Sequence, residues 1–439
     1  MKASYRDGQQ PYAIIIGLES IQGLQSARIL VRRNVPVMAI ASNPHHHCSR
    51  TRVCKEIFFA NTGTEEFIQV LETLGPKLSQ KAVLFPCYDE SVLLVSRLRQ
   101  RLDKWYNIVL PPPEIVEMLT DKISFYTFAQ EEGLPIPRSF FLYCLADAEE
   151  AARQLSYPCL LKPPSRPDTW KRHTRRKAFK VSNAEEFLAI YDHYHGWIDA
   201  LIAQEWIEGN DSNLYTCNCY FGATDEPLVT FVSRKLRQWP PETGQGCLSV
   251  EDRDDTVVLE TIRLFRSVPY RGLGYLEMKR DERTGRYFII EANVGRPTGR
   301  SALAEAGGVE LLYTMYCDAL GWPLPANREQ KYTGVKWIHV LRDIQSALHY
   351  VRRGQLTFRK WWQSVQGPKT DALFSWSDPA PFLTALAKAI PTYLSRRERR
   401  REDYQISRKF RPWRAVRDRH QNPNHERYLK MDKKNKPMR

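Results

Sequence analysis

The sequence lacks the features that define several classes of protein. No stretch approaches the roughly 18 to 20 uninterrupted apolar residues that a membrane-spanning helix needs. The nine cysteines include no CxxC pair, which argues against a zinc site and against a redox motif. The apolar run at residues 13–16, after a polar N-terminus, is too short for a signal peptide. Free thiols without an export signal predict a cytoplasmic protein.

A glycine-rich dinucleotide fingerprint and internal repeats are also missing. Gly17 and Gly23, the two glycines of the first turn region, lie six residues apart and do not form GxGxxG. That spacing favours a purely structural turn over dinucleotide binding.

Positive charge is abundant, with a formal net charge of +15. Residues 396–439 hold 17 lysines and arginines against six acidic residues, a net charge of +11. The other 395 residues therefore carry only +4. A basic protein first suggests nucleic acid or anionic lipid as a partner. Because the basicity is concentrated in a tail, we expect no specific nucleic-acid partner.

Hydrophobic patterning predicts a mixed α/β and α+β chain. Residues 12–16, 35–41 and 81–86 are predicted to be buried parallel strands, and residues 21–31 are predicted to be a helix. A βαβ opening of this kind continues most naturally as a doubly wound, Rossmann-like sheet.

Three consecutive prolines at 111–113 indicate a domain boundary. Beyond them we expect a helix over 115–132, a strand-rich region over 201–293, a helix over 301–320 and a helical, tryptophan-rich extension from 330. The predicted domains are 1–113 (Rossmann-like), 114–205 (small lid subdomain), 206–328 (subdomain with the hairpin described below), 329–395 (helical extension) and 396–439 (basic tail).

Two lysines stand where a phosphate could be reached. Lys122 opens a helix after Asp121, and Lys162 ends the apolar strand 157–161. An ammonium group at a strand mouth can bind phosphate as a point charge. The alternative is a pair of ordinary surface lysines, because lysine is mostly exposed.

The apolar strand over 201–207 passes directly into Glu208-Gly209-Asn210-Asp211. Backbone N–H and C=O groups at such a strand end can pair with a purine edge. A carboxylate such as Asp211 just beyond can accept hydrogen bonds from ribose hydroxyls.

Residues 272–296 are predicted to form a β-hairpin. A hairpin centred on Arg283 places Glu277 opposite Ile289. Alternation then puts Ile289, Glu291 and Asn293 on the face of Glu277. The two glutamates would be diagonal neighbours, roughly 7–8 Å apart at their Cα atoms.

Glu277, Glu291 and Asn293 together offer hard oxygen ligands, which suit Mg²⁺ with phosphate oxygens completing the octahedron. The alternative is the solvent-facing side of a hairpin. The apolar run 288–290 argues against it, because an acid on a strand buried on both faces needs a partner.

Three further segments carry weaker signals. The basic stretch 163–180 is predicted to be a mobile loop that closes over a triphosphate or remains a surface loop. His45 to His47 form a run that cannot easily converge on one metal ion, so a polar connection is favoured. Asp89-Glu90 is expected either to face a ligand at a strand mouth or to cap a helix, and capping is favoured.

The order of these motifs resembles that of the ATP-grasp superfamily. Along the chain, the order is the Rossmann-like domain, Lys122, Lys162 in a YPxxLKP setting, the adenine hinge, the ribose acid and the metal hairpin. The resemblance covers about residues 12–325. Within the superfamily the chain is most similar to the ATP-dependent carboxylate–amine ligases, a group that includes D-aspartate ligase. Supporting stretches are 235–238 with Gly244, 293–296 and 306–309.

This resemblance implies an ATP-grasp fold, ATP and Mg²⁺ as cofactors, and a mechanism through an acyl phosphate that an amine captures. The implied roles are phosphate binding by Lys122 and Lys162, adenine binding by Glu205, Trp206 and Ile207, ribose binding by Asp211, and metal binding by Glu277, Glu291 and Asn293. Arg296, and less directly Arg237, are the candidate catalytic arginines. Tyr275 stands where D-alanine ligases carry an arginine.

Two alternative functions remain open: another ATP-grasp activity (carboxylase or kinase-like), or a non-catalytic protein that binds anions or a membrane through its basic tail. Phe382, Leu386, Ile390 and Leu394 form an i, i+4 stripe that either packs on the protein or lies at a membrane. Expected partners are a small-molecule carboxylate and amine, an anionic inner-membrane surface contacted through residues 380–439, and a second copy in a homodimer.

Overall fold

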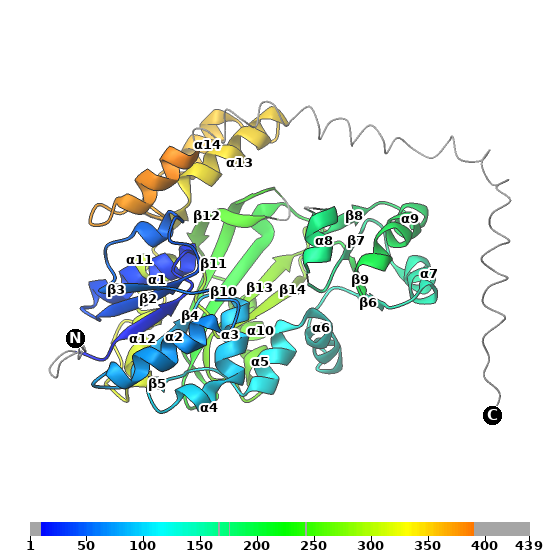
Figure 1. The fold of residues 1–439 in the computed structure, drawn as a ribbon. Coiled ribbons are helices and arrows are strands. Elements are labelled where there is room, and N and C mark those ends of the chain that lie inside the picture. The colour runs from blue at the N-terminus through cyan, green and yellow to red at the C-terminus, as the bar shows by residue number, and fades with distance from the viewer. Residues whose placement is uncertain (1–9, 166, 175, 242–243, 390–439) are drawn as a thin grey trace, which may run out of the picture. The chain divides into compact units, whose positions relative to one another are not determined.

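The computed structural model describes residues 10–389, except residues 166, 175 and 242–243 (Figure 1). The chain divides into two compact units, residues 1–384 and 385–439. The basic tail and most of the predicted 380–439 contact region lie outside the described residues. In the described part, no helix combines the length and the apolar character that crossing a bilayer requires.

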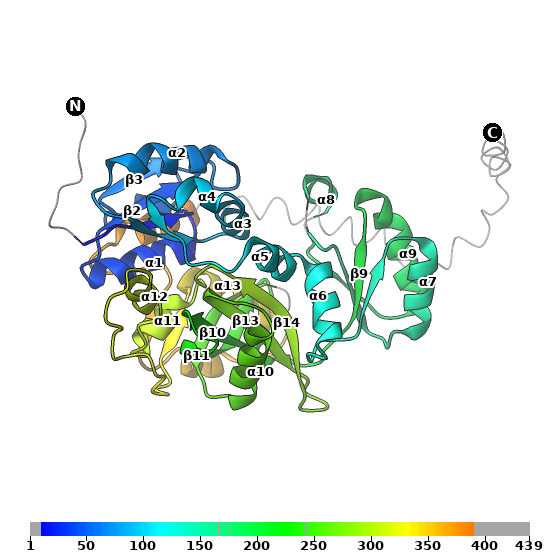
Figure 2. The same ribbon diagram turned by 90° about the horizontal axis from the view of Figure 1, so that it is seen from below.

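The N-terminal region forms a five-stranded parallel sheet with the order β3-β2-β1-β4-β5 (Figure 2). The strands are β1 (Ala13–Ile16), β2 (Val37–Ala41), β3 (Glu56–Phe59), β4 (Ala82–Pro86) and β5 (Tyr106–Asn107). The first βαβ unit, with α1 (Ile21–Arg32), is confirmed. The central strands are fully apolar and buried, which is typical of a sheet covered on both faces.

The edge strands β3 and β5 were not predicted, because edge positions lack the buried apolar run of the central strands. The helices of this region that follow α1 are α2 (Glu66–Leu74), α3 (Asp89–Arg97), α4 (Arg99–Leu102) and α5 (Pro113–Thr120).

The single helix predicted over 115–132 is wrong. The chain forms two helices, α5 and α6 (Lys122–Glu131), separated at Asp121. Asp121 is extended, with φ −75° and ψ 124°, and its side chain accepts a hydrogen bond from the Ser124 N–H at 2.9 Å. This N-cap starts a new helix and places Lys122 in its first turn.

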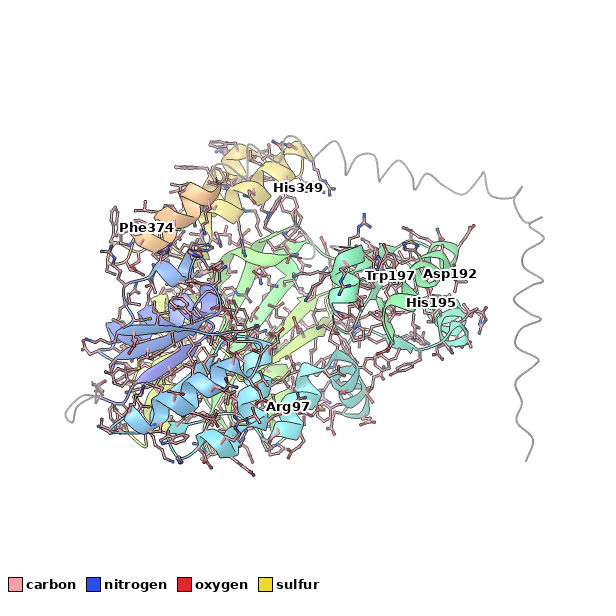
Figure 3. All side chains as sticks on the ribbon, in the orientation of Figure 1. Arg97, Asp192, His195, Trp197, His349 and Phe374 are labelled. Atoms are coloured by element: carbon pink, nitrogen blue, oxygen red, sulfur yellow. The ribbon has the colours of Figure 1, made fainter. Side chains whose placement is uncertain are left out.

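A four-stranded antiparallel sheet with the order β6-β9-β7-β8 follows, which we call the lid sheet. Its strands are β6 (Ser139–Leu142), β7 (Cys159–Lys162), β8 (Phe179–Val181) and β9 (Leu201–Glu205), and its helices are α7 (Leu145–Gln154), α8 (Asp168–His173) and α9 (Ala184–Tyr194). Asp192, His195 and Trp197, on and after α9, are labelled in Figure 3.

The basic stretch 163–180, predicted to be a loop, contains α8 and the start of β8. Trp170 explains the difference. Its ring is fully buried, its Nε1–H donates to the Arg176 carbonyl at 2.9 Å, and it lies 5.3 Å from the Tyr194 ring. One large aromatic side chain therefore anchors a segment whose composition is otherwise polar.

The largest sheet has seven strands in the order β14-β13-β10-β11-β12-β15-β16 (Figure 1). The strands are β10 (Leu214–Phe221), β11 (Pro227–Trp239), β12 (Gln245–Glu251), β13 (Gly272–Arg280), β14 (Tyr287–Val294), β15 (Lys336–Ile338) and β16 (Lys369–Asp371). The associated helices are α10 (Asp255–Arg266), α11 (Ser301–Ala306), α12 (Leu311–Ala319), α13 (Val340–Arg352) and α14 (Phe358–Ser364).

Four short 3₁₀ helices complete the secondary structure of the described residues: η1 (Cys48–Arg50), η2 (Gly75–Lys77), η3 (His195–Trp197) and η4 (Asp211–Asn213). The helix predicted over 301–320 is interrupted between α11 and α12. Gly308 lies at this break with φ +81°, a left-handed conformation that ends a helix readily.

The segment from 330 is not purely helical, because β15 and β16 extend the seven-stranded sheet. Two buried ion pairs attach this segment to the rest of the chain. Arg28 on α1 binds Asp378 at 2.8 Å, and Arg237 on β11 binds Asp343 on α13 at 2.7 Å. Long-range pairs of this kind leave no pattern in a local window of sequence.

Candidate active site

The predicted register of the β13–β14 hairpin is wrong in a way that improves the metal-site geometry. Glu277 lies directly opposite Glu291, and Tyr275 lies opposite Asn293. The register shifts between Glu277 and Met278, whose partner is Ile289. The extra residue on β14 is a β-bulge, which puts the two glutamates on one face as direct neighbours.

Glu277 is held by two cations that the sequence analysis did not assign to the site. Lys235 Nζ on β11 lies 2.9 Å from its Oε2, and Arg300 Nη2 lies 3.1 Å from its Oε1. Burial alone would raise the pKa of the Glu277 carboxyl, but Lys235 and Arg300 outweigh burial and lower its pKa to about 2. Glu277 is therefore ionised at every physiological pH.

Glu291 is in a different environment. Its side chain is 44% exposed and has a single ion pair, to Lys122 Nζ at 3.9 Å. The Asn293 amide oxygen accepts a hydrogen bond from Arg296, while its buried amide nitrogen has no partner among the described residues.

These oxygen donors fit a divalent cation. A carboxylate has about four lone-pair sites, so Glu277 keeps acceptor capacity beyond Lys235 and Arg300. Glu291 faces open space with its charge only loosely paired. Two carboxylates and a carbonyl oxygen on one face form a donor set of the kind that Mg²⁺ prefers.

Lys162, at the end of β7, carries a positive charge without a carboxylate partner in the described part of the chain. Its Nζ donates to Tyr126 Oη at 3.2 Å and to Gln204 Oε1 at 3.0 Å. Both partners are neutral, so this charge remains available to an anion. Lys122 pairs only distantly with Glu291.

A cavity of about 840 Å³ brings most of the predicted residues together. The predicted residues that line it are Lys122, Lys162, Glu205, Trp206, Ile207, Glu277, Glu291, Asn293 and Arg296. Lys235, Arg300 and Arg342 also line it and were missed. A polar run on β11, where a buried strand should be apolar, was the available signal for Lys235.

Arg296 lies at the mouth of the first sheet. Its Nε lies 2.5 Å from Asp89 Oδ1, and its Nη1 donates to the hydroxyl of Tyr275. Tyr275 thus contacts the candidate arginine. Asp89 does not cap α3, because Tyr88 occupies the N-cap position.

Arg237 is not part of this cavity. Its guanidinium is buried and donates to both oxygens of Asp343, at 2.7 and 3.0 Å, and to Ser364 Oγ at 2.7 Å. These contacts make it an anchor for α13. The catalytic role predicted for it is therefore not supported by its position.

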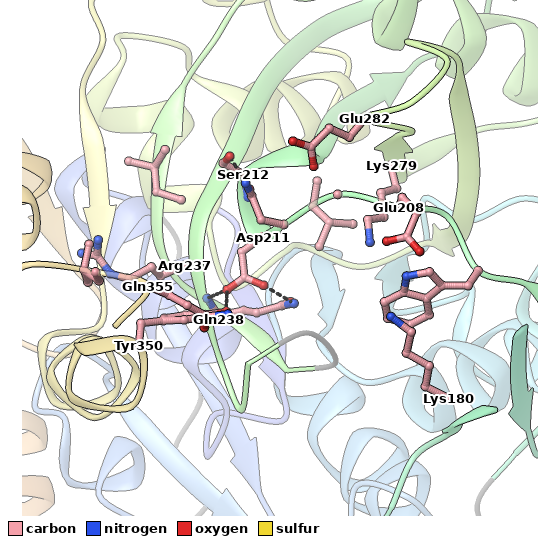
Figure 4. Close-up of a pocket in the computed structure, with 16 residues that line it drawn as sticks. Lys180, Glu208, Asp211, Ser212, Arg237, Gln238, Lys279, Glu282, Tyr350 and Gln355 are labelled. Carbon is pink, nitrogen blue, oxygen red and sulfur yellow. Dashed lines mark hydrogen bonds between the residues drawn. The ribbon is translucent and has the colours of Figure 1, made fainter. Parts of the chain in front are cut away.

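Asp211 lies in a neighbouring cavity of about 560 Å³, which Trp206 and Gln238 also line (Figure 4). Its carboxylate accepts from the Gln238 N–H at 3.0 Å, from Gln238 Nε2 at 2.8 Å and from Tyr350 Oη at 2.6 Å. A ribose hydroxyl would have to share this carboxylate with Tyr350 of α13.

The histidine run converges more than its sequence spacing indicated. Potential ligand atoms of His46, His47 and Cys48 lie within 4.8 Å of one another. Burial raises the pKa of the Cys48 thiol to about 12, so that thiol is protonated at neutral pH and is a poor metal ligand.

No family model matches this chain. The chain is similar to D-aspartate ligase of Enterococcus faecium (strain Aus0004), with 28% identity over 233 residues, or 51% of this chain and 55% of the relative. It is also similar to D-alanine–D-alanine ligase of Xylella fastidiosa (strain Temecula1 / ATCC 700964), with 26% identity over 176 residues, or 37% of this chain and 53% of the relative. The chain spans about half the length of the curated relatives it matches.

Solved structures show the same fold at low sequence identity. An ADP complex of N5-carboxyaminoimidazole ribonucleotide synthetase matches with a TM-score of 0.60 and 13% identity, over 79% of this chain and 86% of that chain. The biotin carboxylase domain of 2-oxoglutarate carboxylase from Hydrogenobacter thermophilus matches with a TM-score of 0.57 and 15% identity, over 73% and 72% of the two chains.

These proteins share one architecture, and this chain has the ATP-grasp fold. Among curated proteins it is similar to ATP-dependent ligases, D-aspartate ligase and D-alanine–D-alanine ligase among them. The resemblance inferred from the motif order is confirmed.

Proposed function

We propose that this protein is an ATP- and Mg²⁺-dependent ligase that joins a carboxylate to an amine and releases ADP and phosphate. One observation carries the proposal: a single cavity brings the phosphate-binding candidates Lys122 and Lys162 together with the directly opposed carboxylates Glu277 and Glu291. Similarity to D-aspartate ligase supports the reaction class.

Lys122 and Lys162 neutralise the ATP phosphates. The peptide groups of Trp206 and Ile207 read adenine together with the Glu205 carbonyl, since the Glu205 N–H already donates to Arg138 O at 2.9 Å. Asp211 accepts hydrogen bonds from the ribose, and its carboxylate also accepts one from the Tyr350 hydroxyl. Glu277, Glu291 and Asn293 hold the magnesium, which would neutralise charge on the phosphate oxygens.

In the first step, a carboxylate oxygen of the substrate forms a bond to the γ-phosphorus as the bond to the ADP oxygen breaks. The amine nitrogen then bonds to the acyl carbon, phosphate leaves with the C–O electron pair, and the amine loses its proton to solvent. Phosphoryl transfer leaves little covalent work for the protein, so charge placement carries the rate. Arg296, held by Asp89 and Tyr275, orients the carboxylate.

A panel of carboxylates crossed with amines, read by ADP release and by mass detection of the amide, tests this function. We expect ADP release that requires Mg²⁺, one carboxylate and one amine. ADP formed equally well without any amine would favour a carboxylase or kinase-like activity, and release with no carboxylate dependence would contradict both.

Lys162→Met is expected to weaken ATP binding by about 10- to 100-fold, because a hydrogen-bonded charge contact of this kind contributes roughly 1.5–3 kcal/mol. Its present partners, Tyr126 and Gln204, are neutral, so the fold loses no ion pair. Calorimetric titration with an ATP analogue measures the effect. Lys77→Met, which alters an exposed lysine outside the cavity, is the control. Equal ATP affinity in the Lys162 variant and the wild type would contradict the phosphate role.

We further propose that the enzyme acts in the cytoplasm and contacts the anionic inner surface of the membrane. Exposed apolar side chains gather on the segment after β15: Ile344, Leu348 and Val351 on α13, Phe358 and Trp362 on α14, and Trp376. We call this set the apolar stripe. The α13 members follow i, i+4, i+7 spacing beside the buried face. Trp376 is 89% exposed, which is unusual for tryptophan.

Charge supports an anionic surface as the proposed partner of the apolar stripe. Arg352, Arg353, Arg359 and Lys360 are exposed beside it, and the sequence beyond residue 389 adds +11. Apolar side chains flanked by basic ones favour an anionic lipid surface, and a lipid contact that combines two signals is more stable than either alone.

The triple variant Phe358→Ser/Trp362→Ser/Trp376→Ser is expected to lose most of its co-sedimentation with phosphatidylserine-containing vesicles. Leu259→Ser, which alters an exposed apolar residue on α10, is the control, and pure phosphatidylcholine vesicles test the need for charge. Equal sedimentation of the triple variant and the wild type would contradict the lipid-binding role of the apolar stripe. The same conclusion would follow if the full-length protein bound neither kind of vesicle. Vesicle co-sedimentation of a chain that ends at residue 395, compared with that of the full-length protein, measures the contribution of the tail. Light scattering tests whether the protein is a homodimer.

A further inference from the structure

Arg342 is the one contribution of α13 to the lining of the 840 Å³ cavity. The residue that follows it, Asp343, is fully buried and held by Arg237 and by Trp361 Nε1 at 3.0 Å. These bonds fix the first turn of α13 against the sheet. The orientation of Arg342 is thus set by a buried anchor next to it in the chain.

Among the described residues, no carboxylate pairs with the positive charge of Arg342. In the part of the chain that the structure describes, it forms no ion pair, and its Nη1 donates only to the neutral Gln245 Oε1 at 2.8 Å. The other arginines of the cavity differ, since Arg296 is paired with Asp89 and Arg300 with Glu277. Burial lowers the pKa of Arg342, but a guanidinium remains charged at neutral pH.

Arg342 reaches the cavity on the far side of β10 and β11 from the metal hairpin. It contacts Gln245 at the start of β12, and β12 lies three strands from β13 in the sheet order. With strands about 4.8 Å apart, roughly 14 Å separates the two backbones. Cys48, which follows the loop after β2, lies close enough to Arg342 to affect its pKa, and His46 and His47 of that loop line the same cavity.

Glu19, Asp89 and Glu90 line the same cavity, but none of them forms an ion pair with Arg342 in the part of the chain that the structure describes. Burial and the positive charge of Arg342 lower the pKa of His339 to about 3, so this histidine is neutral. Gly246, beside Gln245, leaves the space next to Arg300 open: a Cβ there would lie 3.2 Å from Arg300 Nη1. The cavity therefore continues from Arg300 toward Arg342.

We propose that Arg342 forms an anion subsite for a second acidic group of the substrate, remote from the group that reacts. The inference rests on the proposed ligase function and specifies its substrate class. The substrate is an extended molecule with one carboxylate at Arg296 and the magnesium face, and a further carboxylate or phosphate at Arg342. A guanidinium can form a bidentate pair with either a carboxylate or a phosphate.

The test measures binding separately from turnover. Thermal unfolding of the full-length protein with Mg-ADP is followed on addition of glutarate, adipate or suberate, each compared with its monomethyl ester. We expect at least one diacid to raise the Tm more than its ester, and Arg342→Gln to abolish that difference. Arg353→Gln, just beyond α13, is the control. For the substrate found in the panel, Arg342→Gln should raise KM about 10- to 100-fold, with kcat and the KM for ATP unchanged.

Different results would contradict the proposed ligase function and the anion subsite. A wild-type protein whose Tm does not respond to Mg-ADP would contradict the proposed function. A Tm that responds to Mg-ADP while diacids and esters act equally, or a diacid preference that survives in Arg342→Gln, would overturn the anion subsite. A KM for ATP that rises together with the substrate KM would assign Arg342 to the phosphates instead.

Discussion

Replacing Glu291 with glutamine is expected to lower Mg²⁺-dependent turnover by about 100-fold or more, the effect typical of removing a main electrostatic contact to the transition state. The structure predicts that stability stays nearly unchanged. The side chain is 44% exposed and its ion pair with Lys122 spans 3.9 Å, so the pair contributes little to folding.

Steady-state ADP release across a magnesium titration, together with the Tm, measures both sides of this prediction. Glu117→Gln is a suitable control, because Glu117 is similarly exposed in a surface pair with Arg97, outside the cavity. If the Glu291 variant kept wild-type turnover and the wild-type magnesium requirement, Glu291 would not be a metal ligand.

Glu277→Gln should lose activity and also unfold more easily, by about 3–5 kcal/mol at neutral pH, since it leaves two buried cations without their partner. Lys235 and Arg300 are only 6% and 9% exposed, and both bind this carboxylate. The contrast with Glu291 follows from the environment alone, because the two residues are chemically identical and directly opposed across the hairpin.

The pH dependence gives Glu277 a second signature. Its pKa is about 2 in the folded protein, below the roughly 4.3 of a free glutamate. The stabilisation is therefore complete above about pH 4.3 and is lost as the pH falls through 2. Urea unfolding at pH 7 and pH 3 should show the gap between wild type and Glu277→Gln narrowing at the lower pH. A gap that is constant with pH would show that ionisation of Glu277 does not contribute.

Sequence patterns predicted the βαβ opening and the order of the candidate site residues along the chain. Buried parallel strands such as β1 and β2 are continuous apolar runs that stand out locally. Local patterns did not reveal the break at Asp121, because a single capping residue ended a sequence that is helical in composition on both sides. They also missed α8, where a single buried tryptophan outweighs a basic segment.

The sequence alone predicts the candidate groups for a nucleotide site: two lysines, two glutamates, an asparagine and a strand-end hinge, in an order that resembles an ATP-grasp protein. The register, the ion pairs and the exposure of these groups depend on the tertiary structure. The bulge on β14 placed Glu291 opposite Glu277, and β11 and the segment after β14 supplied Lys235 and Arg300 to hold one glutamate and leave the other open. Arg237 forms a buried anchor with Asp343, whereas Arg342 lines the 840 Å³ cavity. Contacts between residues far apart in the chain set these roles, because burial and pairing are properties of the packed fold and not of the local sequence.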